Sequence, residues 1–165
     1  MFVLGIDPGL STTGYGVVDV RAASVKVVAA GTIRTDPAAP VASRLAELHA
    51  DVVGLIVEHA PEELAIEEVF VNRNLQTAMA VGRASGVVML AAAVAGIPVY
   101  EYTPTAVKRA VTGSGRAGKA QVETMVSRRL GVPTGGAPAD AYDALAVALC
   151  HAQAAPLRLA VRGGS

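Results

Sequence analysis

The first third of the chain alternates short apolar runs with turn residues. Residues 2–7, 12–20 and 25–34 are rich in valine and isoleucine, and Pro8-Gly9 and residues 21–24 separate these three runs. Links this short predict an antiparallel meander of three strands. Two prolines in residues 36–40 then predict a loop.

An amphipathic helix is predicted for residues 41–59. Its apolar residues recur at spacings of four and three: Val41, Leu45, Leu48, Val52 and Leu55. Charged residues, Arg44 among them, fall on another face, so we expect this helix to pack by one side. Pro61 ends it, and residues 64–67 form a short apolar strand with Glu67 at its end.

The stretch 75–95 predicts a long helix in which Arg83 is almost the only charge. A helix that is apolar nearly all round must be covered on more than one side. One sheet covers one face, so we expect a second protein surface against the other, with residues 82–86 as a small-residue groove. A membrane span is disfavoured, because Arg83 and Pro98 bracket the run and alanine dominates it, whereas a span needs about 20 strongly apolar residues.

The rest of the chain predicts one more strand and three helices. Thr103 and Pro104 are typical of a helix start. We expect a strand at 97–102, helices at 104–111, 119–130 and 138–154, loops at 113–118 and 134–138, and a loose tail at 155–165. The order β-β-β-α-β-α-β-α-α-α predicts an α/β domain over residues 1–154, with a mixed five-stranded sheet whose first three strands are antiparallel and with helices on both faces.

Composition agrees with one globular domain. The chain has 165 residues, of which 52% are hydrophobic and 17% charged. Cys150 is the single cysteine, which excludes an intramolecular disulfide and disfavours a cysteine-based zinc site. No basic segment precedes the short apolar run at the start, so we expect no signal peptide and a cytoplasmic location.

The formal net charge is zero, but the charges are unevenly distributed. Residues 1–70 hold 4 Lys and Arg against 10 Asp and Glu, and residues 71–165 hold 10 against 4, so the two parts carry −6 and +6. This asymmetry suggests an acidic pocket bordered by a basic surface. The alternative is that the charges are scattered over a solvated surface.

Four acids lie on otherwise apolar elements. Asp7 and Glu67 end predicted strands, where a carboxylate is costly unless it is paired or holds a cation; Asp7 alone would equally suit a turn cap. Asp140 and Asp143 are three residues apart and therefore share one helix face, with no basic residue within one turn to pair with them. The helix dipole explains Asp140 better than Asp143.

Oxygen-only ligands suit Mg²⁺ or Mn²⁺. Two such ions roughly 4 Å apart bind an attacking water and a leaving oxygen for in-line displacement at phosphorus, with no covalent nucleophile. The four acids therefore predict a metal-dependent phosphodiester hydrolase.

Several motifs carry a resemblance to a known family. They are Gly5-Ile6-Asp7-Pro8-Gly9, Thr13-Gly14-Tyr15-Gly16, Ala65-Ile66-Glu67-Glu68-Val69-Phe70, Val107-Lys108, Lys119-Ala120-Gln121-Val122 and Asp140-Ala141-Tyr142-Asp143-Ala144-Leu145-Ala146. Together, over about residues 2–151, they resemble the RuvC family of bacterial Holliday-junction resolvases in the ribonuclease-H-like superfamily. Each motif alone is weak, but the set in this order is specific.

The resemblance implies a magnesium-dependent endonuclease that acts in recombination and repair. It would be a homodimer that nicks two opposing strands of a four-way junction within short T-rich sequences, leaving 5′-phosphate and 3′-hydroxyl ends, and would work with the branch-migration helicase complex of RuvA and RuvB. Two Mg²⁺ ions, replaceable by Mn²⁺, would be held by Asp7, Glu67, Asp140 and Asp143. The dimer contact would fall on the helix at 75–95, where we place Gly82, Gly86, Val88 and Met89.

The resemblance also implies DNA contacts. Phe70 matches an aromatic residue that wedges against bases, although core packing explains it equally well. Lys108 and Lys119 match lysines near the scissile phosphate, with Lys119 a catalytic candidate; ordinary solvated lysines are the alternative. We add three neighbouring polar residues to the DNA contacts: Arg73, Asn74 and Arg116. Glu68 should point to the opposite face of the strand from Glu67.

Tyr142 departs from the family pattern, which more often has a small residue between the last two acids. It could narrow the site or add a hydroxyl contact. His151 lies eight residues after Asp143 on the same predicted helix, but a core or surface role fits it better than a place at the site, and the three histidines show no ligand spacing.

Three other functions fit parts of the sequence. Residues 113–120 nearly match a phosphate-binding P-loop, but Ala120 stands where Ser or Thr is needed. A sugar-kinase or actin-like ATPase shares the early aspartate and turn but needs a second domain. A junction-binding module without catalysis is disfavoured, because an uncompensated acidic cluster repels DNA.

Overall fold

Five strands form one mixed sheet. The computed structural model describes residues 1–22, 24–69 and 74–162, with the backbone alone for 155–162. The strands are β1 (Phe2–Asp7), β2 (Thr12–Arg21), β3 (Ser24–Arg34), β4 (Glu63–Glu67) and β5 (Val99–Tyr102), in the spatial order β3-β2-β1-β4-β5. The first three pair antiparallel, and β4 and β5 run parallel to β1. The predicted mixed five-stranded sheet, with its first three strands antiparallel, is confirmed.

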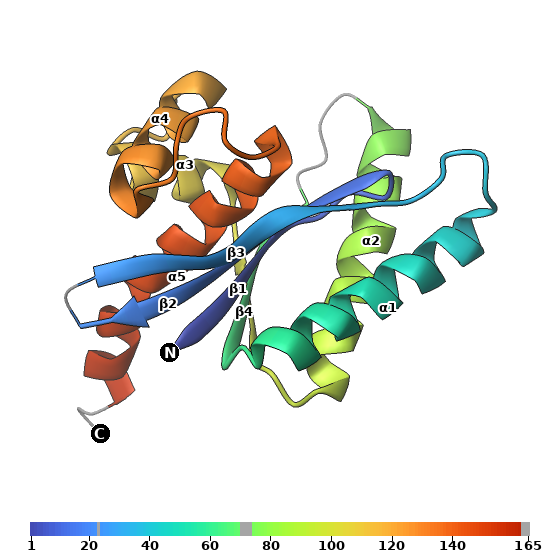
Figure 1. The fold of residues 1–165 in the computed structure, drawn as a ribbon, viewed down its shortest axis with the longest axis horizontal. Helices are drawn as coiled ribbons and strands as arrows, with labels where there is room; N and C mark the ends of the chain where they lie inside the picture. The colour runs from blue at the N-terminus through green and yellow to red at the C-terminus, as the bar shows by residue number, and fades with distance from the viewer. Residues whose placement is uncertain (23, 70–73, 163–165) are drawn as a thin grey trace.

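Helices cover both faces of the sheet (Figure 1). On one face lie α1 (Val41–His59) and α2 (Leu75–Val94), and on the other lie α3 (Pro104–Thr112), α4 (Lys119–Leu130) and α5 (Ala139–Arg162). Each side has its own hydrophobic core, because alternate strand residues point to opposite faces: Leu4 and Ile6 pack toward α1 and α2, and Val3 and Val18 pack toward α5. The predicted α/β architecture, with helices on both faces of a mixed sheet, is confirmed.

The last helix is longer than predicted. It runs to Arg162, so residues 155–162, which we expected in a loose tail, are helical. Pro156 lies in this extension, and proline lacks the backbone N–H that a helix interior needs. The loss of one hydrogen bond does not end the helix here.

Arg44 lies on the buried side of α1, contrary to the sequence prediction. Its side chain is only 7% exposed. Its guanidinium donates to Thr35 Oγ1 at 2.9 Å and to Ser11 Oγ at 2.7 Å, and Thr35 in turn donates to the carbonyl of Leu10 at 2.6 Å. The first turn of α1 covers the loops that follow β1 and β3, where these hydroxyls replace water around the charge. Arg44 thereby fixes the turn that follows Asp7.

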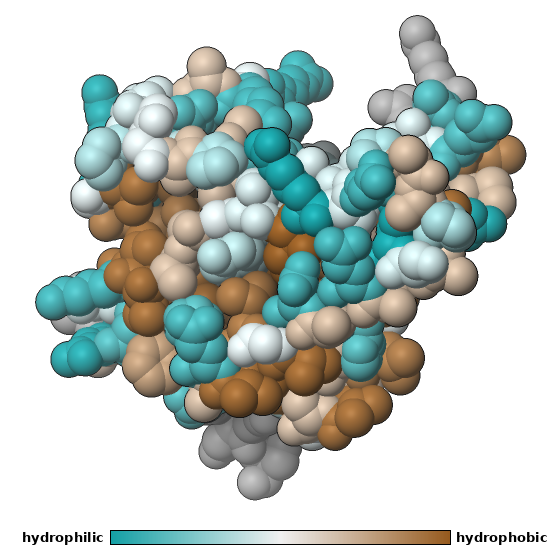
Figure 2. Space-filling model, turned by 45° about the vertical axis from the view of Figure 1, so that its right-hand side comes forward, coloured by the Kyte–Doolittle hydropathy of each residue, from teal (hydrophilic) through white to brown (hydrophobic). Residues whose placement is uncertain are grey.

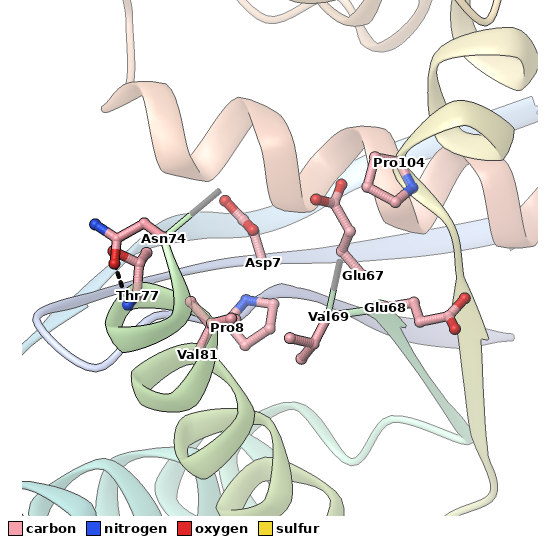
Figure 3. Close-up of a pocket in the computed structure, with 10 residues that line it drawn as sticks. Asp7, Pro8, Glu67, Glu68, Val69, Asn74, Thr77, Val81 and Pro104 are labelled. Carbon is pink, nitrogen blue, oxygen red and sulfur yellow. Dashed lines mark hydrogen bonds between the residues drawn. The ribbon is translucent and has the colours of Figure 1, made fainter. Parts of the chain in front are cut away.

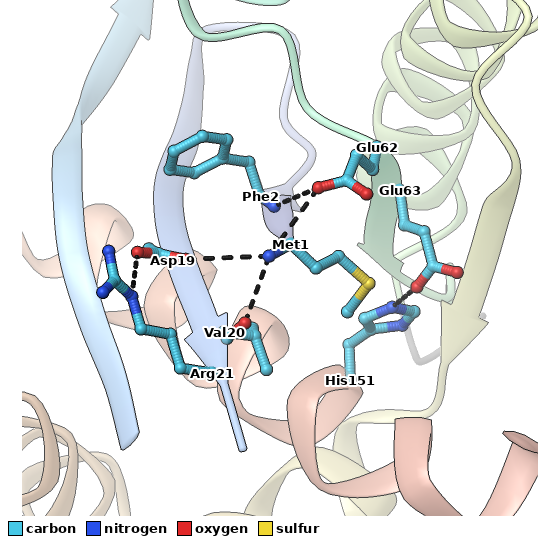
Figure 4. Close-up of polar contacts among 8 residues, drawn as sticks. All are labelled: Met1, Phe2, Asp19, Val20, Arg21, Glu62, Glu63 and His151. Carbon is cyan, nitrogen blue, oxygen red and sulfur yellow. Dashed lines mark hydrogen bonds and ion pairs between the residues drawn. The ribbon is translucent and has the colours of Figure 1, made fainter. Parts of the chain in front are cut away.

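Polar contacts anchor the other end of the sheet (Figure 4). The Met1 ammonium lies 3.2 Å from the carbonyl of Val20. His151 is fully buried, with Nε2 2.5 Å from Glu63 Oε2 and Nδ1 2.9 Å from the Tyr102 hydroxyl. Because Glu63 begins β4 and Glu67 ends it, His151 is a core residue at the far end from the acids.

One side of α2 packs and the other is exposed. Five residues are buried against the neighbouring helix and sheet: Ala84, Ser85, Val88, Ala91 and Ala92. The opposite side exposes Leu75, Met79, Leu90 and Val94, together with Gly82 and Gly86. Figure 2 shows hydrophobic surface interrupting the polar surface on the side that carries α1 and α2.

The expected interface position of Val88 is wrong. It is fully buried in the core between α1, α2 and the sheet, so a partner chain has no access to it. Met89 is partly buried. An all-apolar helix offers no polar face from which the sequence predicts the side that turns inward. Among the described helices, α2 is long and apolar enough to cross a membrane, but core helices of soluble proteins meet the same criteria.

Candidate active site

Asp7 stands at the centre of the predicted site. It ends β1, the middle strand of the sheet, and its side chain points toward α5 (Figure 3). The turn after it is closed by Thr13, whose hydroxyl donates to the carbonyl of Gly9 at 2.6 Å. Rigid backbone on both sides therefore holds this carboxylate at the end of the sheet.

Asp7, Asp140 and Asp143 converge as predicted. One carboxylate oxygen from each lies within 4.8 Å of those of the other two. Gly14 makes the approach possible: it pairs with Asp7 across β1 and β2, and a Cβ on it would lie 1.9 Å from the carbonyl oxygen of Asp140. A glycine at this position lets the first turn of α5 sit directly on the sheet. This role of Gly14 is not evident from the sequence, because it depends on where α5 lies on the sheet.

Glu67 lies beside this group but outside the set of three. It ends β4, the parallel neighbour of β1, and lines the same two cavities as Asp7. Figure 3 shows its carboxylate directed toward the helix that carries Asp140, whereas the carboxylate of Glu68 points away from the other acids. The expected separation of Glu67 and Glu68 is confirmed.

Lys119 forms an ion pair that the local sequence did not reveal. Its Nζ lies 2.7 Å from Asp143 Oδ2. The basic partner of Asp143 does not lie within one turn of it on α5, because it comes from 24 residues earlier, at the start of α4. Only the packing of α4 against α5 brings the two side chains together.

Burial and mutual repulsion perturb the acids. The pKa of Asp7 is raised to about 7, first by burial and then by the negative charges of Glu67, Asp143 and Asp140, with Lys119 acting in the opposite direction. The pKa of Glu67 is also raised, chiefly by burial and by Asp143. A divalent cation would remove both causes, since it compensates the charge and replaces water as the partner of the carboxylates.

This perturbation predicts how the stability of the metal-free protein depends on pH. Because the folded-state pKa of Asp7 lies above its ordinary 3.8, the folded state binds this proton more tightly than the unfolded state. The free energy of unfolding should therefore fall as the pH rises from about 4 to about 7. Asp7→Asn should remove that part of the fall and be more stable than the wild type at pH 8.

Urea unfolding in EDTA at several pH values measures this effect. The stability difference between Asp7→Asn and the wild type should be larger at pH 8 than at pH 5. A difference that is the same at both values would mean that Asp7 has an ordinary pKa in the folded protein.

Two cavities meet at Asp7 and Glu67. One also contains Lys108 and Lys119, and the other lies along the start of α2 and contains Asn74 and Thr77 (Figure 3). The Asn74 side chain accepts from the backbone N–H of Thr77 at 3.1 Å and so caps α2.

The remaining three expected DNA contacts are Arg116, Phe70 and Arg73, and none of them lines the part of the two cavities that the structure describes. Arg116 is exposed in the loop before α4 and lines neither cavity. Phe70 and Arg73 lie outside the described residues.

Tyr142 neither narrows the site nor contributes a hydroxyl to it. The side chain is 1% exposed and belongs to the core on the α5 side of the sheet. Its hydroxyl donates to the carbonyl of Pro133 and accepts from the backbone N–H of Gly136 at 3.1 Å. Successive helix residues point in different directions, so this neighbour of two acids instead anchors the loop before α5.

The geometry favours metal-assisted chemistry at phosphorus. The cluster offers only carboxylate oxygens, which hard divalent cations prefer. The lysines in the adjoining cavity provide positive charge where a phosphate backbone would pass. Carboxylates suited to divalent cations and ammonium groups suited to phosphates therefore lie side by side.

Comparisons with known proteins agree with this geometry. A family model described as crossover junction endodeoxyribonuclease RuvC matches residues 3–151. The protein of that name from Pelotomaculum thermopropionicum is 51% identical over 92% of this chain and 93% of its own length, and that from Moorella thermoacetica is 49% identical over 96% and 95%. The structure of Thermus thermophilus RuvC in complex with Holliday junction substrate superposes with a TM-score of 0.89, at 40% identity over 95% of this chain and 96% of that one.

Proposed function

Since the chain belongs to the RuvC family of crossover junction endodeoxyribonucleases, it is a nuclease of four-way DNA junctions, and we propose that the acids around Asp7 form its active site. The convergence of Asp7, Asp140 and Asp143 within 4.8 Å is the observation that carries this assignment. Glu67, which shares both cavities with Asp7, is the fourth acid.

The proposed cofactor is Mg²⁺, two ions per site, with Mn²⁺ as a substitute. The four acids would hold these ions, which, when bound, activate the attacking water and stabilise the departing 3′-oxygen. The protein's contribution is to fix the carboxylates before metal and DNA arrive. The pairing of β1 with β4 positions Asp7 and Glu67, and the close packing of α5 on the sheet positions Asp140 and Asp143.

The lysine cavity is the proposed path of the cleaved strand. Lys108 and Lys119 line it beside Asp7 and Glu67, and their ammonium groups would bind the scissile or adjacent phosphates. Asn74 in the other cavity and the exposed Arg116 are proposed as further DNA contacts. Such contacts fix the register of the strand over the acids.

Paired nicks require two active sites, and we propose a homodimer formed through the exposed side of α2. Leu75, Met79, Leu90 and Val94 are each more than half exposed there, and Gly82 and Gly86 leave room for a close approach.

The RuvA and RuvB helicase complex is the proposed partner on the junction, and the cytoplasm is the proposed location.

A charge on the exposed side of α2 should weaken this dimer. Leu90 is 57% exposed, so Leu90→Glu would place a carboxylate in the interface without disturbing the core. We expect the dimer dissociation constant in analytical ultracentrifugation to rise at least about tenfold, as for an unpaired charge in an apolar contact.

Val57→Glu is the matched control for Leu90→Glu, because Val57 is 78% exposed on α1. It should leave the dimer unchanged. If Leu90→Glu sediments as the wild type does, the interface lies elsewhere.

The proposed function is tested by incubating the protein with a synthetic four-way junction and with a linear duplex of the same sequence, each with and without Mg²⁺ or Mn²⁺. We expect metal-dependent nicks in two opposing strands of the junction and an intact duplex. Binding without nicks in any metal would contradict the proposed function and identify a junction-binding module.

A further inference from the structure

The ion pair between Lys119 and Asp143 places a cation from the protein itself at the acid cluster. The ammonium lies 2.7 Å from one oxygen of Asp143, the aspartate whose carboxylate also belongs to the group of three. Lys119 lines the cavity that contains Asp7 and Glu67 as well. In the metal-free protein, this lysine therefore supplies positive charge where divalent cations are proposed to bind.

We propose that Lys119 is the exchangeable counter-charge of the metal-free site, and that a divalent cation displaces its ammonium from Asp143 and frees it for the DNA phosphate. This inference rests on the proposed function and adds to it the order in which metal and DNA engage the site. Metal binding comes first, and the lysine becomes available to the strand as a consequence.

The two side chains differ in their freedom to move. Asp143 is 26% exposed and is flanked on α5 by the buried Tyr142 and Ala144. Lys119 is 62% exposed, on a flexible stem at the first residue of α4, after the loop 113–118. When a divalent cation arrives, repulsion between the two cations at one carboxylate moves the lysine, because the aspartate is held by the core.

Lys108 provides the internal comparison. It lines the same cavity and carries the same charge. Within the described part of the chain it forms no ion pair, whereas Lys119 does. A general effect of positive charge on metal affinity would appear in variants of both lysines, but displacement from Asp143 is specific to Lys119.

The first measurement is Mn²⁺ binding without DNA, followed by the electron paramagnetic resonance of free Mn²⁺. Lys119→Gln should bind Mn²⁺ about threefold to fivefold more tightly than the wild type, the range set by a partly exposed ion pair. Lys108→Gln should gain less than about half of that factor. Equal gains in both variants, or no gain in Lys119→Gln, would overturn the exchange.

The second measurement follows the lysines directly, by acylation with an amine-reactive reagent and mass spectrometry. Mn²⁺ should raise the labelling of Lys119 relative to Lys108 in the wild type and leave the ratio unchanged in Asp7→Asn. An unchanged ratio in wild-type protein that binds Mn²⁺ would overturn the exchange but keep the metal site. Absence of Mn²⁺ binding to the wild type would instead contradict the proposed function.

Discussion

Asp7→Asn should abolish cleavage of a four-way junction while leaving junction binding intact. Asp7 is the central acid of the site, and its carboxylate faces those of Asp140 and Asp143. Asparagine keeps the shape but removes the charge and one acceptor, so the variant holds divalent cations poorly. We expect the single-turnover cleavage rate to fall at least about a thousandfold, or about 4 kcal/mol of transition-state stabilisation.

Binding should respond in the opposite sense. Loss of a negative charge beside the DNA path removes repulsion from the phosphates, so the junction affinity measured without metal should stay equal or rise. Asp51→Asn is the matched control, because Asp51 is an exposed aspartate on α1. It should cut and bind like the wild type. Near-normal cleavage by Asp7→Asn would refute the assignment of the metal site.

The acids could be predicted from the sequence because their positions conflict with their surroundings. A turn cap explains Asp7 alone and the helix dipole explains Asp140 alone, but a bound cation explains all of these carboxylates together. The strands could be predicted from short runs rich in valine and isoleucine between turn residues, and the helix at 41–59 from apolar residues spaced by three and four. The spatial order of the strands was not predicted, because it depends on the pairing of β1 with β4 and of β4 with β5, which lie far apart in the sequence.

What the sequence did not reveal depends on contacts between distant elements. Arg44 looks like a surface residue of an amphipathic helix until the loops after β1 and β3 are placed over it. Val88 lies inward and Leu90 outward on a helix that is apolar on both sides. The partner of Asp143 comes from another helix, and Tyr142 turns from the acids toward the loop at Pro133.

Gly14→Ala should reduce cleavage strongly although it replaces no charged residue. A Cβ on Gly14 would lie 1.9 Å from the carbonyl oxygen and 2.5 Å from the carbonyl carbon of Asp140. Both are backbone atoms, so no side-chain rotation relieves the clash, and the first turn of α5 must move away from β2. Asp140 then moves away from Asp7. A displacement of about 1 Å at catalytic groups costs about a hundredfold in rate, which is the loss we expect in single-turnover cleavage.

Two other glycines separate this effect from a general loss of stability. A Cβ on Gly16 would meet the side chain of Leu145, first at 2.7 Å, so Gly16→Ala strains the same contact farther from Asp140. A Cβ on Gly54, on α1, would have no neighbour within 4 Å, so Gly54→Ala should cut normally and gain about 0.5–1 kcal/mol of unfolding free energy. Gly14→Ala should lose more cleavage than Gly16→Ala at equal loss of stability by urea unfolding. Equal activity in these two variants would mean that Gly14 maintains the general packing of α5 on the sheet and not the specific position of Asp140.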